Sequence, residues 1–243
     1  MEKKSAFWLI AYSILSAVVI VAEVLPREIL IYCTKPLLMP ALAIWLVQRT
    51  PGIRRFLRQT LLAGLLFSML GDTFLMFGSG PYGTLFFLLG LGSFLCTHLC
   101  YLGGFFSEVR PEKGFLRRHP YWILPFLIFL LAFLAWLWPG IPAGLQWPVV
   151  AYAGIISLMA LSVLNMRGQH VVPFVLNGML AGALLFMFSD CLIAVIRFGQ
   201  GFPGARPAIL LTYLLGQWLI IRGGSQILRR FPDKKPAAAT LPA

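Results

Sequence analysis

Long apolar runs alternate with short polar breaks along most of the chain. Eight runs of spanning length lie at residues 7–25, 29–48, 57–77, 83–106, 121–138, 146–164, 172–196 and 207–228. Each is long enough for an α-helix to cross the hydrocarbon core of a bilayer, which takes about 20 residues. Turn-forming residues such as Pro51, Gly52, Pro139 and Pro142 separate the runs. The pattern predicts an all-α polytopic membrane bundle of about eight transmembrane helices.

The predicted helices form one transmembrane domain over residues 1–230, followed by a short basic tail at 231–243 that we expect to be disordered. The domain contains a short internal sequence repeat. Residues 63–72 align without gaps with residues 181–190, and both segments end in an aspartate. Because these segments belong to the third and seventh runs, the chain is expected to hold two four-helix halves in parallel orientation.

Composition supports a chain solvated by lipid. Hydrophobic residues make up 59% of the chain, charged residues 12%, and the mean hydropathy is +0.85. The net charge of +12 lies in short loops, so it indicates membrane orientation and no nucleic-acid partner. All but four lysines and arginines fall on the N-terminal side; the exceptions are Arg27, Lys35, Arg197 and Arg206. We therefore expect a bacterial inner-membrane protein with both termini in the cytoplasm.

Four charged residues lie inside or at the edge of the predicted spans: Glu23, Lys35, Asp72 and Asp190. Each charge in a span costs about 2.5–3.5 kcal/mol on insertion scales and therefore needs a reason. Lys35, Asp72 and Asp190 are expected in one layer, roughly 7–9 Å below the outer edge at the helical rise per residue. The two aspartates form a candidate acid–base pair. The alternative is a structural ion pair between Lys35 and one of them.

Several neutral polar residues are candidates to line the same cavity. Tyr213 and Gln217 share a helix face, and so do His98 and Tyr101, while Ser189 directly precedes the second aspartate. His98 is expected well past the midplane, toward the cytoplasmic side. These residues can equally satisfy one another between helices. No paired metal-ligand motif occurs and the four cysteines lie in apolar segments, so no metal, cofactor or disulfide framework is expected.

Five short motifs in order along the runs resemble the YhhN family of membrane proteins. They are TKPL at 34–37, GD at 71–72, HLCY at 98–101, FSD at 188–190 and YLLGQ at 213–217. The resemblance covers nearly the whole chain from the second run onward. The family usually has alanine before the glutamine, where this chain has Gly216, and we expect this difference to affect packing more than chemistry. Glu23 has no counterpart in the family pattern.

The resemblance implies a lysoplasmalogenase, which hydrolyses the vinyl ether of a lysoplasmalogen to a fatty aldehyde and glycerophosphoethanolamine or glycerophosphocholine. That reaction needs an acid to protonate the alkene carbon and a base to activate water. Asp72 and Asp190 are the expected catalytic pair, in either assignment. Lys35 is the expected contact for the lipid phosphate. The partners implied are the lysophospholipid substrate and membrane lipids.

Three other functions fit parts of the same pattern. A proton-coupled transporter also has two similar halves with an acid in each, although its site usually lies near the midplane between broken helices. An intramembrane aspartyl protease also uses two aspartates, but its Gly-x-Gly-Asp signature is missing here. A non-catalytic lipid-binding protein is the third possibility.

Overall fold

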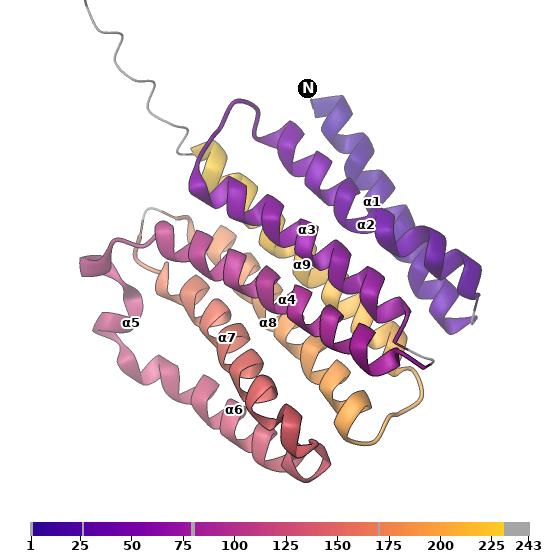
Figure 1. Ribbon diagram of the computed structural model, residues 1–243. Coiled ribbons are helices and arrows are strands. Elements are labelled where there is room, and N and C mark those ends of the chain that lie inside the picture. Colours follow the sequence, from indigo (N-terminus) through magenta and orange to yellow (C-terminus); the bar gives the residue numbers. More distant parts are fainter. Residues whose placement is uncertain (1, 26, 79–80, 170, 231–243) are drawn as a thin grey trace, which may run out of the picture.

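The computed structural model describes residues 2–25, 27–78, 81–169 and 171–230, and the predicted tail at 231–243 lies outside the described residues. The described residues form a helical bundle (Figure 1). Its eight long helices are α1 (Glu2–Val24), α2 (Glu28–Arg49), α3 (Phe56–Met76), α4 (Gly83–Ser107), α6 (Ile123–Leu137), α7 (Gln146–Asn165), α8 (Pro173–Phe198) and α9 (Ala205–Arg230). A short helix, α5 (Phe115–Arg118), lies in the loop between α4 and α6. The predicted all-α bundle of about eight spans is confirmed.

Among the described residues, seven of the long helices are by themselves long and apolar enough to cross a membrane. The eighth, α9, is less apolar because it contains four arginines in addition to buried polar residues such as Gln217 and Ser225. It packs against α1, α2, α3 and α8, and Figure 1 shows it behind α3. A helix enclosed in this way needs less lipid-compatible surface than one at the periphery.

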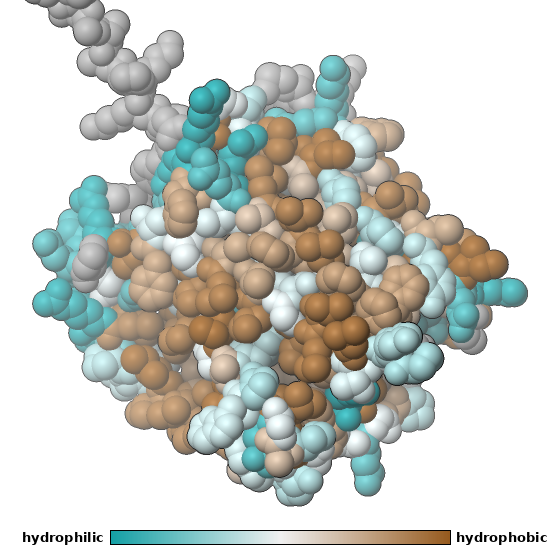
Figure 2. All heavy atoms as spheres, viewed as in Figure 1, coloured by the Kyte–Doolittle hydropathy of each residue, from teal (hydrophilic) through white to brown (hydrophobic). Residues whose placement is uncertain are grey.

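The outer surface has the character of a membrane protein. Large apolar side chains such as Ile29, Ile128 and Phe174 are more than half exposed. Figure 2 shows brown, hydrophobic residues across the middle of the molecule and teal, hydrophilic residues gathered toward its edges. An exposed apolar surface of this extent is stable only in contact with lipid. The chain is therefore an integral membrane protein.

The two predicted halves are visible in the packing. In the first half α2 packs against α3 and against α9 from the other half; in the second, α7 packs against α8 and against α4. Gly64 on α3 leaves room for the ring of Tyr101 on α4, and the aligned Gly182 on α8 leaves room for the backbone of Ile220 on α9. The sequence repeat thus corresponds to a repeated pairing of helices, α3 with α4 and α8 with α9.

Gly216 lies where α9 crosses α8. A Cβ atom at this position would be 2.8 Å from the carbonyl oxygen of Gly182, and a Cβ at Gly182 would be equally close to the oxygen of Gly216. Glycine at both positions lets the two backbones approach closely. The position that distinguishes this chain from the YhhN pattern is therefore a helix-packing position.

Candidate active site

Asp190 on α8 lies at the centre of a buried hydrogen-bonded group. Its Oδ2 accepts a hydrogen bond from the hydroxyl of Tyr152 on α7 at 2.6 Å and one from Nε2 of His98 on α4 at 2.9 Å. The Asp190 residue is 9% exposed, and His98 is fully buried. The other ring nitrogen of His98, Nδ1, has no hydrogen-bond partner among the described residues. Three helices therefore converge on one carboxyl group.

An apolar pocket begins at this carboxyl group. Asp190 and Tyr152 belong to its wall, and its cavity volume is about 60 Å³. Its remaining wall is almost entirely aromatic and aliphatic side chains of α4, α6, α7 and α8, among them Phe87, Leu91, Phe94, Phe129, Phe133, Ile156, Met187 and Phe198. Because α6 packs chiefly on α7, it leaves the space toward α4 and α8 to be filled by side chains alone.

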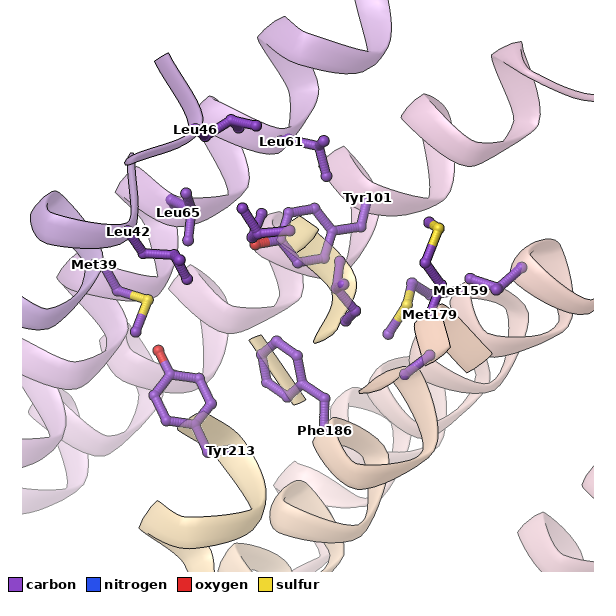
Figure 3. Packing of buried hydrophobic residues seen from close by; sticks show 14 of the residues in the cluster. Met39, Leu42, Leu46, Leu61, Leu65, Tyr101, Met159, Met179, Phe186 and Tyr213 are labelled. Carbon is purple, nitrogen blue, oxygen red and sulfur yellow. The ribbon is translucent and has the colours of Figure 1, made fainter. Parts of the chain in front are cut away.

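Asp72 on α3 belongs to a second polar group. Its Oδ2 accepts a hydrogen bond from the hydroxyl of Tyr213 on α9 at 2.8 Å, and the residue is 6% exposed. It does not line the pocket. The Tyr213 ring packs against Phe94 and Phe186, with centroids 5.7 Å and 5.2 Å apart, and Figure 3 shows Phe186 beside Tyr213. The two carboxyl groups interact electrostatically, but aromatic rings lie between their hydrogen-bonded groups.

Lys35 lies apart from the pocket, and its closest anionic partner is not an aspartate. Its Nζ is 3.4 Å from Oε1 of Glu23, whose other oxygen is 4.0 Å from Arg206. Glu23 is therefore the ion-pair partner of Lys35 within 4 Å, and Lys35 also interacts electrostatically with Asp72. Since α1 and α2 are antiparallel neighbours joined by a short turn, the end of one faces the beginning of the other. Glu23, which the family pattern left unexplained, has its ion pair there.

The remaining predicted lining residues connect helices instead of facing the pocket. Gln217 accepts a hydrogen bond from Tyr101 and donates one to Ser68, both at 2.7 Å. Ser189 donates to the backbone oxygen of Ile209 at 3.1 Å and so does not orient the neighbouring carboxyl group. Gln217 and Tyr101 thus satisfy each other between helices, whereas Ser189 bonds to the backbone of α9.

His98 was expected well past the midplane, yet its Nε2 lies 2.9 Å from Oδ2 of Asp190. The ring of Phe87, near the start of α4, packs against Phe198 at the end of α8 with centroids 6.1 Å apart. His98 lies eleven residues along α4 from Phe87, and Asp190 lies eight residues along α8 from Phe198. His98 is therefore only three residues deeper than Asp190, which is about 4–5 Å at the helical rise. The side chains cover that difference. Assigning every span the same outer edge produced the error.

Sequence reasoning missed Tyr152 and the pocket that it lines. The available signal was a single phenol in the middle of an otherwise apolar span at residues 146–164. A buried tyrosine hydroxyl usually has a hydrogen-bond partner, which makes such a residue a candidate for contact with a buried acid. Among the described residues, no three histidine, cysteine, aspartate or glutamate side chains gather as they would around a metal ion.

These features define a class: a polytopic membrane protein that holds buried carboxyl groups inside its bundle, one of them in the wall of an apolar pocket. The chain belongs to the YhhN family, whose model matches residues 30–224. It is 30% identical over 193 residues to lysoplasmalogenase TMEM86A of Bos taurus, which covers 75% of this chain and 73% of that protein.

A lysoplasmalogenase of Mycobacterium bovis is 29% identical over 184 residues, covering 74% of this chain. This chain spans 65% of the length of that mycobacterial relative. Lysoplasmalogenase TMEM86B of Homo sapiens is 28% identical over 189 residues, covering 76% of this chain and 70% of that protein. No solved structure matches the chain significantly.

Proposed function

We propose that this protein is a lysoplasmalogenase that hydrolyses the vinyl ether bond of an alkenyl-glycerophosphoethanolamine or -choline to a fatty aldehyde and a glycerophospho-alcohol. The observation that carries the proposal is the position of Asp190, a hydrogen-bonded carboxyl group in the wall of an apolar pocket. The similarity to proteins named lysoplasmalogenase supports the same substrate class.

The pocket suits the hydrocarbon part of this substrate. A lysoplasmalogen has one long alkenyl chain, which loses contact with water when apolar side chains surround it. Because α6 packs chiefly on α7, the chain enters from the bilayer between α6 and the pair α4 and α8. The vinyl ether, at the end of the chain nearest the headgroup, then lies beside Asp190.

The reaction requires two proton transfers in opposite directions. The acid gives its proton to the alkene carbon, whose π electrons form the new C–H bond, and the adjacent ether becomes an oxocarbenium ion. The base takes a proton from water as the water oxygen adds to that cation, giving a hemiacetal. The hemiacetal then breaks its bond to the glycerol oxygen, which takes the proton that the base had accepted, while the ionised acid takes the hydroxyl proton, so that the aldehyde is released and both groups return to their starting states.

The hydrogen bonds suggest which carboxyl group has which role. Two donors, Tyr152 and His98, meet on one oxygen of Asp190, and such donors stabilise the ionised carboxylate. We therefore assign Asp190 as the base, which also stabilises the cation electrostatically. Asp72 is the acid. The ring of Phe94 lies between the pocket and Tyr213, the partner of Asp72. In this proposal the Phe94 side chain rotates before Asp72 transfers its proton to the alkene.

The activity is tested by incubating the purified protein in detergent with lysoplasmalogen and, separately, with an ester lysophospholipid of the same chain length. We expect fatty aldehyde from the first substrate and no free fatty acid from the second. Asp190→Asn, which keeps the shape of the side chain, is the matched inactive control. Binding of lysoplasmalogen without release of aldehyde would favour a lipid-binding protein instead.

For the orientation, we propose that both termini face the cytoplasm of a bacterial inner membrane. Loops rich in cations meet at one end of the bundle, where Arg55 pairs with Glu108 and the Leu116 amide bonds to Asn165. Single cysteines at Glu112 and Gly201, both exposed, test this in a background without native cysteines. An impermeant thiol reagent should label the cysteine at 201 in intact cells; labelling at 112 would invert the orientation.

A further inference from the structure

A cation lies at the rim of the apolar pocket, in the last turn of α8. The guanidinium carbon of Arg197 is 4.6 Å from the centre of the Phe87 ring, and its Nη2 is 3.4 Å from the hydroxyl of Thr84. Phe87 and Phe198, the next residue on α8, both line the pocket. Stacking on an aromatic face fixes the plane of a guanidinium group while its N–H edges stay available.

No acidic side chain among the described residues neutralises Arg197 by an ion pair. Three other cations lie near this end of the bundle: Lys35 and Arg206 both face Glu23, and Arg27 precedes α2 and does not line the pocket. Arg197 is also exposed, so a ligand can reach it without unfolding the helix end. The pocket therefore has apolar walls and one unpaired positive charge at its mouth.

The spacing along α8 matches the substrate. Arg197 follows Asp190 by seven residues, which places both on nearly the same face of the helix and about 10 Å apart along its axis. In a lysoplasmalogen, five covalent bonds separate the vinyl ether oxygen from phosphorus, a span of about 6 Å when extended. The lengths of the Asp190 and Arg197 side chains cover the difference between these two distances.

We propose that Arg197 binds the phosphate of the lysophospholipid and so sets how deep the vinyl ether lies in the pocket. The inference rests on the proposed function, and it moves the phosphate contact from Lys35 to a residue that the motifs did not indicate. Arginine suits this role because its planar fork of donors can bond two phosphate oxygens at once. A substrate without phosphate lacks that contact, so its vinyl ether is not held at a fixed depth in the pocket.

A binding measurement tests the proposal independently of turnover. The probes are a saturated 1-O-alkyl lysophosphocholine, which has no vinyl ether to hydrolyse, and the 1-O-alkylglycerol that lacks the phosphate. Wild type should bind the phospholipid about tenfold or more tightly than the glycerol, as one charge-assisted contact allows. Arg197→Gln should abolish this preference, and Arg197→Lys should restore part of it. Arg206→Gln, the same charge change at the same end, should leave it intact.

Kinetics on lysoplasmalogen give a second readout. Arg197→Gln should raise KM by about tenfold while changing kcat less, because the contact is present before and during the reaction. Unchanged phospholipid preference in folded Arg197→Gln protein, or an equal loss in Arg206→Gln, would overturn the proposal. If wild type releases no aldehyde yet prefers the phospholipid through Arg197, the proposed reaction fails and the phosphate site stands.

Discussion

Replacing Tyr152 by phenylalanine removes one hydroxyl group and leaves the apolar wall of the pocket nearly unchanged. That hydroxyl donates a 2.6 Å hydrogen bond to Oδ2 of Asp190, where His98 remains as the second donor at 2.9 Å. The carboxyl group keeps one partner in the variant, so the bundle should still insert and fold. The change isolates the contribution of the missing donor to the charged state of Asp190.

The expected magnitude follows from the kind of hydrogen bond that is lost. A hydrogen bond to a charged group contributes about 1.5–3 kcal/mol, against roughly 0.5–1.5 kcal/mol for one between neutral groups. If the ionised Asp190 acts as the base, losing a difference of about 1–1.5 kcal/mol leaves less protein with the reactive carboxylate, and kcat should fall by about tenfold. The loss of thermal stability should be smaller because the ring still packs in place.

Tyr213→Phe is the matched comparison. It removes the 2.8 Å donor to Asp72 from a tyrosine that is equally buried. If Asp72 reacts in its protonated form, a lost neutral hydrogen bond should lower kcat less than about tenfold. Both variants should be assayed for aldehyde release and for melting temperature in the same detergent. Full activity in Tyr152→Phe, or equal losses that follow unfolding in both variants, would refute the assignment of Asp190 as the base.

Other substitutions test the remaining parts of the site and bundle. Asp72→Asn and Asp190→Asn should fold normally yet each lose at least the ~10²–10⁴-fold that acid–base catalysis supplies, with non-additive loss in the double variant, as aldehyde release will show. Lys35→Met should lower the melting temperature by breaking its ion pair while leaving lysolipid affinity unchanged; weakened affinity at unchanged stability would return the phosphate contact to Lys35. Gly216→Ala should destabilise the bundle by about 1–3 kcal/mol, because its Cβ would lie 2.8 Å from a backbone oxygen of α8, whereas Gly178→Ala, in open space, should not.

The fold was predictable from sequence because apolar runs, breakers and loop charges report on the bilayer directly. The site was only partly predictable. Asp72 and Asp190 stood out because a charge inside a span is costly, and His98 and Tyr213 because they are polar within apolar helices. What each of them contacts depends on the axial offset and tilt of helices far apart in sequence. Hydropathy carries no information on either, so Tyr152 and the pairing of Lys35 with Glu23 were not found.

The two halves of the bundle are similar in plan, and their difference explains why only one aspartate faces the pocket. In the first half α1 packs against both α2 and α9, and α3 also packs directly on α9, so the space around Asp72 is closed. The counterpart of α1 is α6, which packs chiefly on α7 and leaves α4 and α8 separated by side chains. The pocket lies in that space, and Asp190 is part of its wall. Two equivalent carboxyl groups thus come to lie in unequal surroundings, which is what an acid and a base acting on one substrate require.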